Sequence, residues 1–367
     1  MKKFLLSIIM VFGIISSCND TDEVIVGPTF DRSILLNNWF NNHINPSLNN
    51  FSNELSQLKS DFTSAKNNGI DIVSLEKLRN SYKSTYKAWQ YVEMFNIGKA
   101  EEIYYTATVN IYPVNTTRVE SNISSGDYNL NNPNNYPAQG LPTIDYILFG
   151  IGSTDTEILE KLKDEGKYMN YLSSIIEEMS SNTSKVVTDW ETYKAEFLSS
   201  TDNTATSAVN MMVNDFIFYY EKGFRANKFG IPAGVFSSAP IPENVEAYYS
   251  GYSKDLSIEA IGAIKDLFIG RHPFNGTVYS GSSLKSILLD LDSNEGQNNL
   301  ANKIESKIDV AINKINSLEE NYYNQIQNDN NKFLQTYDAI QEVVVLLKVD
   351  MLQLLSINVD YVDADGD

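Results

Sequence analysis

The sequence predicts an all-α protein with two helical-bundle domains packed side by side. Apolar residues recur at spacings of three and four over most of the chain, as they do in amphipathic helices. No Asn-Gly pair is flanked by the alternating residues of a β-hairpin. The polar stretch Thr201-Asp202-Asn203-Thr204 is a candidate linker, and 367 residues with 42% hydrophobic content are enough for two cores.

The chain begins with a segment typical of a bacterial export signal. Residues 1–17 contain Lys2 and Lys3 followed by an apolar run that is too short to span a bilayer. Ile15-Ser16-Ser17-Cys18 resembles a lipobox, which predicts lipid on Cys18 and anchoring to a membrane by the acyl chains. We expect residues 18–32 to be an acidic tether, similar to the export tag of surface lipoproteins in Bacteroidetes-type bacteria. The predicted location is the cell envelope, as an outer-membrane lipoprotein exposed at the surface.

The first predicted bundle covers residues 33–202. Within it Pro46 should kink a helix or begin one, and the helical pattern that follows should stop at Asn67-Asn68-Gly69. The following helix is expected to end near Gly98. An irregular loop segment comes next, near residues 110–140, and a last long helical pattern closes the bundle.

The second predicted bundle covers residues 203–357 in the same helical style. Helical patterns over 208–229 and 243–270 flank an irregular Pro- and Ser-rich loop at 230–242. Two further long helices complete the bundle. Residues 358–367 are predicted to be an acidic tail.

Charge and residue usage exclude several kinds of site. The net charge of −19, from 28 basic and 47 acidic residues, argues against nucleic acid as a partner, because phosphates require clustered basic residues. Cys18 is the only cysteine, so neither an intramolecular disulfide nor a cysteine zinc site can form. The two histidines, His43 and His272, lie far apart in sequence, and each is expected at a helix end or on the surface rather than as a ligand.

One short stretch, Gly140 to Gly150, has the pattern of a buried helix that carries an acid. Pro142 suits the first turn, and Ile144, Ile147 and Leu148 share one face. Asp145 is expected in the first turn, where the helix dipole favours a carboxylate. Gly150 is expected to form a left-handed cap.

The residues Gly140-Leu141-Pro142-Thr143-Ile144-Asp145 resemble a degenerate Gly-x-His-x-x-Glu motif of the imelysin-like family, also called insulin-cleaving metallopeptidase-like. Pro142 stands where the family has His, and Asp145 stands where it has Glu. Proline cannot replace an imidazole ligand. The resemblance extends from about residue 34 to the end, through Trp89 to Glu93, Tyr112-Pro113, Glu221 to Pro232 and Glu246 to Ser253.

The resemblance implies a ligand-binding site in which no residue is assigned a catalytic role. Its predicted members are Glu93, Arg118, Gly140, Asp145, Glu221, Lys228, Glu246 and Ser253. Glu93, Asp145 and Glu221 are the predicted metal ligands, for iron or another divalent cation, because buried carboxylates are costly unless paired or metal-bound. Alternatively the acids are exposed on the polar faces of amphipathic helices, and Arg118 is a solvated loop residue.

The implied role is in iron or haem acquisition. We expect a lipid-anchored, non-catalytic protein that binds a metal ion or small ligand at the domain interface, with an outer-membrane uptake system as a further partner. One alternative is a metallopeptidase of the imelysin type, which Pro142 and the lack of a His-Glu-x-x-His sequence disfavour. The other is a polysaccharide-binding lipoprotein with tyrosine-lined grooves, although tyrosines at helical spacing also suit a core.

Overall fold

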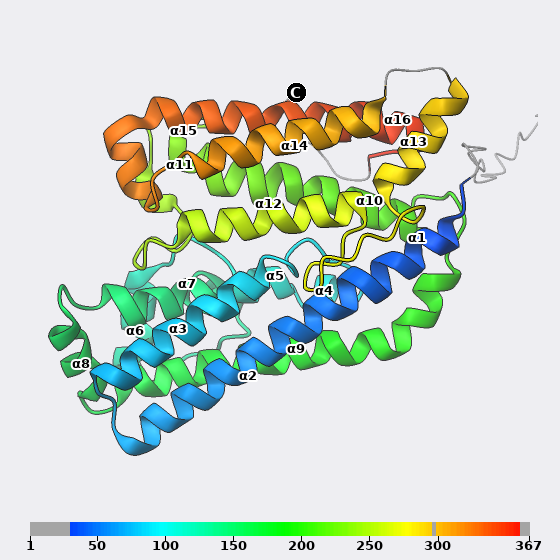
Figure 1. The fold of residues 1–367 in the computed structure, drawn as a ribbon. Coiled ribbons are helices and arrows are strands. Elements are labelled where there is room, and N and C mark those ends of the chain that lie inside the picture. Colours follow the sequence, from blue (N-terminus) through cyan, green and yellow to red (C-terminus); the bar gives the residue numbers. More distant parts are fainter. Residues whose placement is uncertain (1–29, 296–298, 360–367) are drawn as a thin grey trace, which may run out of the picture.

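The computed structural model describes residues 30–295 and 299–359, and its regular elements are helices (Figure 1). In the first half these are α1 (Arg32–Trp39), η1 (Phe40–Ile44), α2 (Asn45–Asn68), α3 (Ile72–Trp89), α4 (Lys99–Glu102), α5 (Tyr105–Val109), α6 (Thr116–Ser125), η2 (Pro133–Ala138), α7 (Gly140–Asp145), η3 (Tyr146–Gly150), α8 (Asp155–Lys163) and α9 (Lys167–Ser199). In the second half they are α10 (Ala208–Phe218), η4 (Tyr219–Gly230), α11 (Ile231–Ala233), η5 (Pro242–Asn244), α12 (Ser253–Ile269), α13 (Leu284–Glu295), α14 (Leu300–Asn316), α15 (Tyr322–Val345), η6 (Leu346–Met351) and α16 (Leu352–Leu355). Four of these segments, η1, η3, η4 and η6, are π-helical, whereas η2 and η5 are 3₁₀ turns.

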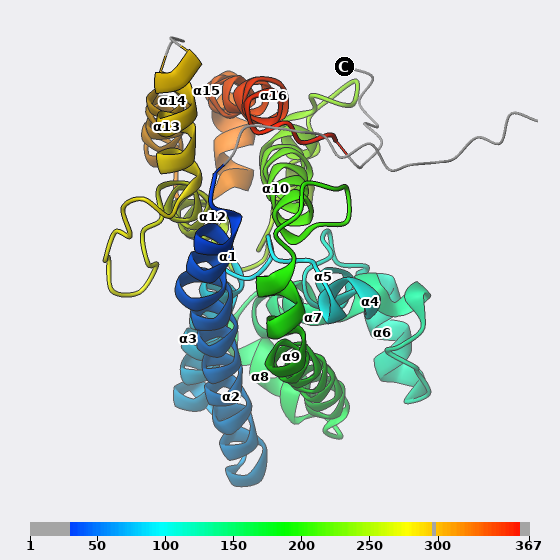
Figure 2. The same ribbon diagram turned by 90° about the vertical axis from the view of Figure 1, so that its right-hand side faces the viewer.

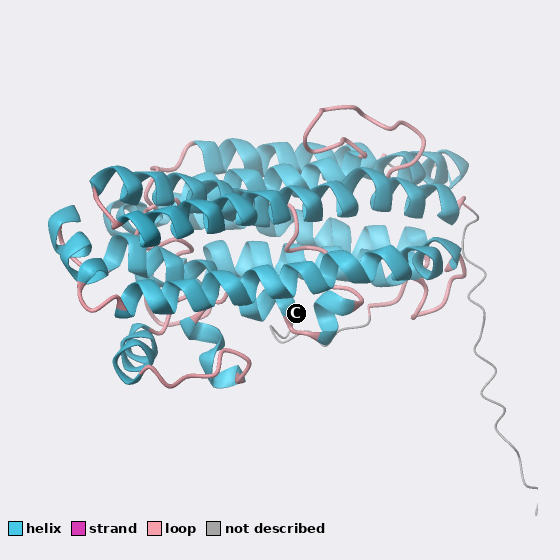
Figure 3. Ribbon diagram, turned by 90° about the horizontal axis from the view of Figure 1, so that it is seen from below, coloured by secondary structure: helices cyan, strands magenta, loops and turns pink. Residues whose placement is uncertain are grey.

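The all-α prediction is confirmed. Within residues 30–295 and 299–359 there is no β-strand, and the β-pairing found there is one isolated bridge between Arg271 and Val278. Figure 3 shows helices joined by loops in this part of the chain. None of the described helices is both long and apolar enough to cross a membrane.

The helices form two layers, and the long helices of both layers have similar orientations. In Figures 1 and 2 the helices up to α9 gather in one layer and those from α10 onward in the other. Within the layers α2 packs on α3 and α9, and α14 packs on α12 and α15; α12 also contacts α3 across them. A single cluster of buried apolar side chains runs through both layers. The division into two domains at residues 202 and 203 stays a prediction.

The predicted terminal segments lie outside the described residues. These are the signal peptide at 1–17, Cys18, nearly all of the acidic tether at 18–32, and the acidic tail at 358–367 except for its first two residues.

Several local features differ from the sequence-based expectation. Pro46 is an exception, because α2 begins at Asn45 directly after η1, and beginning a helix is one of the two outcomes predicted for this proline. The helix predicted to reach Gly98 ends at Trp89 and is followed by a turn. The segment near 110–140 is less irregular than predicted, since it contains α6 and η2. His43 is buried rather than superficial, and burial lowers its pKa to about 3.

Gly140 and Gly150 have different roles at the two ends of the motif stretch. Gly140 has a φ of +73°, and a Cβ there would overlap the carbonyl oxygen of Val109. Gly150 does not have a positive φ, so the predicted left-handed cap is wrong. A Cβ at Gly150 would instead overlap the ring of Tyr249, so this glycine allows close contact with the second half of the chain.

Gly140→Ala should therefore destabilise the protein more than a substitution that only strains the backbone. The expected loss in the free energy of unfolding is about 1–2 kcal/mol for the left-handed conformation plus about 1–3 kcal/mol for the overlap with Val109. Gly126→Ala is the matched control, because Gly126 has a φ of +67° and nothing within 4 Å of its Cβ position. Urea denaturation measures the free energy of unfolding of both variants. Equal losses in the two variants would contradict a role for the close approach of Gly140 to Val109.

Candidate functional site

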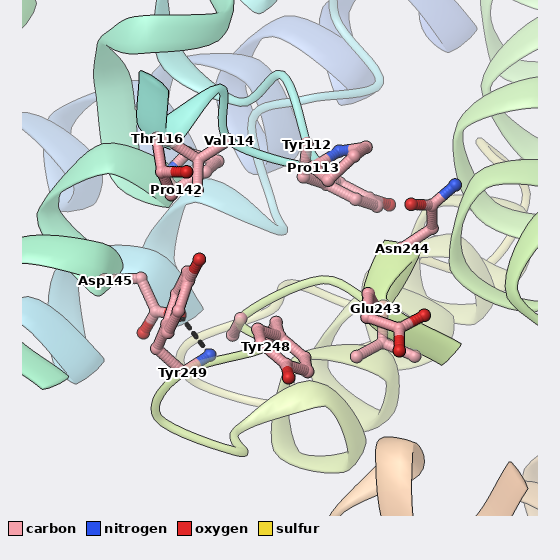
Figure 4. A pocket seen from close by; sticks show the side chains of 12 residues that line it. Tyr112, Pro113, Val114, Thr116, Pro142, Asp145, Glu243, Asn244, Tyr248 and Tyr249 are labelled. Carbon is pink, nitrogen blue, oxygen red and sulfur yellow. Dashed lines mark hydrogen bonds between the residues drawn. The ribbon is translucent and has the colours of Figure 1, made fainter. Parts of the chain in front are cut away.

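A cavity of about 400 Å³ lies where the motif stretch meets the second half of the chain, and we call it the interface pocket (Figure 4). Half of its lining comes from each half of the sequence. The lining residues are Tyr112, Pro113, Val114, Thr116, Pro142, Asp145, Glu243, Asn244, Val245, Ala247, Tyr248 and Tyr249. A pocket of this size can hold a small organic molecule.

Asp145 is the buried acid of this pocket, with 1% of its surface exposed. The Tyr82 hydroxyl donates a hydrogen bond to Oδ1 at 3.0 Å. The backbone N–H of Tyr249 donates to Oδ2 at 2.9 Å, as Figure 4 shows. The Ser250 N–H adds a longer bond of 3.4 Å to Oδ2. Because Tyr82 lies on α3 and the N–H groups belong to the turn before α12, the carboxylate links the two halves.

The sequence-based reason for Asp145 is wrong even though its burial suits a site. The helix begins at Gly140, so Asp145 is the last residue of α7 and not part of its first turn. The N–H groups of Tyr249 and Ser250 provide the donors expected from the start of the helix. Burial raises the pKa of Asp145 to about 6, while these hydrogen bonds act in the opposite direction.

A second buried network lies between the same two halves. Lys228 Nζ and Glu246 Oε2 form an ion pair at 2.5 Å, with 1% and 2% of the side chains exposed. Gln90 accepts from Lys228 at 2.8 Å and donates to Glu246 at 3.3 Å. Asn110 Nδ2 donates both to Glu246, at 3.0 Å, and to Glu93, at 3.1 Å. Gln90, Asn110 and Glu93 come from the first half, so this network also joins the halves.

Glu93 is the member of the second network with an incomplete set of hydrogen bonds. Its Oε2 atom is buried without a hydrogen-bond partner among the described residues, and so is the hydroxyl of Tyr219. Burial raises the pKa of Glu93 to about 7, although the positive charge of Lys228 opposes that shift. Burial therefore favours the protonated form of Glu93 more than water does.

The two networks are neighbours along α3. Tyr82, which binds Asp145, and Tyr86 lie one turn apart with ring centroids 5.7 Å from each other. The Tyr86 hydroxyl donates to Asn110 Oδ1 at 2.6 Å. Burial, reinforced by the negative charges of Asp145 and Glu246, raises the pKa of both tyrosines. Both therefore stay neutral and act as donors.

The predicted site residues are only partly brought together. Glu93, Lys228 and Glu246 share the second network, and the Ser253 hydroxyl donates to the backbone carbonyl of Glu246 at 2.5 Å. Glu93 and Glu246 lie in turns, not in the helices predicted for them. Asp145 lies in the neighbouring network, and Gly140 begins the helix that carries it.

Glu221 and Arg118 have other partners. Glu221 is buried beside Lys348, at 3.2 Å, with Lys222 and Arg225 at 3.4 and 3.7 Å. Arg118 is exposed on α6, where its backbone N–H is bonded by the capping side chain of Asn115.

The residues present do not fit a metal centre built on the motif. No group of three or more His, Cys, Asp or Glu side chains with metal-binding spacing occurs in residues 30–295 and 299–359. Glu221 is paired with Lys348, Lys222 and Arg225, so its carboxylate already has positively charged partners. Pro142 lines the pocket without offering a ligand atom, and Asp145 already accepts three hydrogen bonds.

Several polar residues of the two networks are missing from the sequence-based set. Tyr82 and Tyr86 follow the apolar spacing of α3 and so resemble core residues. Gln90 and Asn110 carry no charge, and the family resemblance did not assign either of them to the site. The sequence did contain one signal for these residues. A tyrosine predicted to be in the core has a hydroxyl that requires a hydrogen-bond partner, so Tyr82 and Tyr86 could have been expected to bind polar groups.

Asp145→Asn should change how stability depends on pH. Between the ordinary pKa of 3.8 and about 6 the native carboxyl holds its proton more tightly than the unfolded one, so this group's contribution to stability decreases as pH rises through that window. Asparagine does not titrate. The stability of Asp145→Asn relative to wild type should therefore increase from pH 4 to pH 6.5 in urea denaturation. The exposed Asp127→Asn is the control; a pH-independent difference for Asp145→Asn would refute the assignment.

Comparison with known proteins agrees with this fold. The imelysin family model matches residues 44–349. No curated protein matches the chain in sequence. One similar structure is a candidate iron-regulated protein A precursor from Parabacteroides distasonis ATCC 8503, with a TM-score of 0.74 and 18% identity over 89% of this chain and 96% of that one.

Another similar structure is an imelysin-like protein from Psychrobacter arcticum 273-4, with a TM-score of 0.69 and 16% identity over 92% of this chain and 100% of that one. At these identities the structural likeness concerns the fold. The family match, in contrast, covers most of the chain. This chain belongs to the imelysin family.

Proposed function

We propose that this protein is a lipid-anchored, non-catalytic envelope protein that binds a small ligand in the interface pocket as part of iron or haem acquisition. The observation that carries the proposal is the pocket itself, because both halves of the chain line it and a buried acid lies in its wall. Pockets built between two packed layers are common ligand sites. The name of the Parabacteroides relative, an iron-regulated protein, supports the physiological context.

A binding role fits the chemistry of the pocket better than hydrolysis. Metal-assisted hydrolysis needs a metal held by protein ligands with one position left for water. Pro142 offers no ligand, and the donors from Tyr82, Tyr249 and Ser250 surround Asp145. We therefore assign Asp145 to holding the pocket wall and providing its charge. Binding of a bare ion, iron or another divalent cation, has weaker support than binding of a molecule that fills the cavity.

The proposed membrane attachment rests on the sequence before residue 30, where Ile15-Ser16-Ser17-Cys18 predicts lipid on Cys18. The outer-membrane location and an uptake system as partner are also proposals.

Cys18→Ser should abolish incorporation of labelled palmitate and move the protein from the membrane fraction to the soluble fraction. Metabolic labelling and fractionation measure both. Ser17→Ala is the control, because it keeps the thiol and a small residue before it. Labelling that persists in Cys18→Ser would exclude this anchor.

Thr116→Trp should block the interface pocket. Thr116 lines the pocket at the start of α6, whereas its neighbour Thr117 is exposed and is not part of the lining. We expect fragments that bind wild type in ligand-observed NMR to bind Thr117→Trp and to lose binding to Thr116→Trp. Unfolding curves of both variants check that the fold is kept. A fragment library with no hit that Thr116→Trp removes would contradict the proposal.

A further inference from the structure

The interface pocket has an uneven distribution of charge. Of the twelve residues that line it, Asp145 and Glu243 are the charged ones, and both are acids. None of the twelve is a Lys, Arg or His. A concave site whose fixed charges share one sign attracts ligands of the opposite sign, and the effect is largest where low-dielectric walls exclude water.

The acid at the mouth of this pocket is not neutralised by a neighbour. Glu243 is exposed on η5, and no Lys or Arg forms an ion pair with it within residues 30–295 and 299–359. Two basic residues on α3, Arg79 and Lys83, are bound elsewhere, to Asp155 at 2.7 Å and to Asp255 respectively. The negative charge of the pocket is therefore available to a ligand.

A third acid lies next to the pocket. Glu120 is on α6, one turn after Thr116, and accepts hydrogen bonds of 2.7 Å from the hydroxyls of Tyr146 and Tyr168. The ring of Tyr146 lies 5.1 Å from that of Tyr249, which lines the pocket. Neutral tyrosines bind this carboxylate in place of a cation, so its charge adds to the negative field.

Aromatic rings in the pocket wall provide further groups that can bind a cation. Tyr112, Tyr248 and Tyr249 line the pocket, and the rings of Tyr248 and Tyr249 are 4.9 Å apart at 76°. The faces of such rings attract ammonium and guanidinium groups. The chain already shows this interaction beside the motif, since Lys83 Nζ lies 4.2 Å from the ring centre of Tyr252.

We propose that the interface pocket binds an organic cation, a small molecule that carries a primary ammonium or a guanidinium group. This inference depends on the proposed ligand-binding function and adds the class of ligand. Glu243 and the tyrosine faces contact the cation. Asp145 contributes mainly charge from the wall, because Tyr82, Tyr249 and Ser250 already donate to its carboxylate.

Four probes of similar length test the class of ligand. Cadaverine carries two ammonium groups, and agmatine carries one ammonium and one guanidinium group. Glutaramide is neutral, and glutarate is a dianion. Titration calorimetry at low and moderate salt should show binding of cadaverine and agmatine, weaker binding at higher salt, and no binding of glutarate. Thr116→Trp should abolish cation binding and Thr117→Trp should not.

Single-charge variants test the role of Glu243. Glu243→Gln should weaken cadaverine binding about three- to fivefold, the range expected for one partly exposed charge pair. Glu76→Gln removes an exposed acid on α3 outside the pocket and should leave the affinity unchanged. Equal weakening by both variants would identify general attraction to an acidic surface and would overturn the inference, as would cation binding that survives Thr116→Trp.

The outcomes separate this inference from the proposed function. Glutaramide or glutarate bound as tightly as cadaverine, with binding lost in Thr116→Trp, would overturn the cationic class and leave a ligand-binding pocket. If no probe and no library fragment shows binding that Thr116→Trp removes, both proposals are wrong.

Discussion

The buried ion pair between Lys228 and Glu246 constrains the arrangement of the two layers. Charges removed from water are tolerated only when partners surround them, and loss of one partner from such a pair costs about 3–5 kcal/mol. Here the additional partners, Gln90 and Asn110, come from the other half of the chain. A shift of one layer along the other would leave a buried charge without its hydrogen bonds. The pair therefore fixes the relative position of the layers, and with it the walls of the interface pocket.

The residues that make these contacts lie where regular helices stop. Glu93 and Glu246 are in turns, Asp145 immediately precedes η3, and Lys228 belongs to η4. Turns and π-helical segments direct side chains in ways that continuous α-helices do not, and π-helical segments are frequent at functional sites. The cost of the irregular backbone is offset by buried hydrogen bonds between the layers. Such bonds are strong in a low-dielectric interior only when nearly every member has a partner. The unpartnered Oε2 of Glu93 is a weak point of this network.

The same geometry explains what the sequence could and could not predict. Apolar spacing predicted the helical fold, since buried residues such as Leu75, Leu78 and Tyr82 recur on one face of α3. Apolar spacing could not predict that the side chains of Glu221 and Lys228 point to different partners. Seven residues apart, they would share a face at 3.6 residues per turn. The wider winding of η4 instead directs Lys228 to Gln90 and Glu221 to Lys348. Buried tyrosines and amides were missed because a core position and a hydrogen-bonding position have the same periodicity.

Asp145 connects the stability of the interface with the charge of the pocket. Its hydrogen bonds to Tyr82, Tyr249 and Ser250 favour the ionised carboxylate, whereas burial favours the protonated one. Above its pKa of about 6 the carboxylate is mostly charged, so a cation in the pocket would meet a negative wall. A ligand bound only by the folded chain also stabilises that chain. A cation held beside Asp145 would lower the cost of keeping this charge buried between the layers. Occupancy of the pocket and the integrity of the contact between the layers therefore depend on each other.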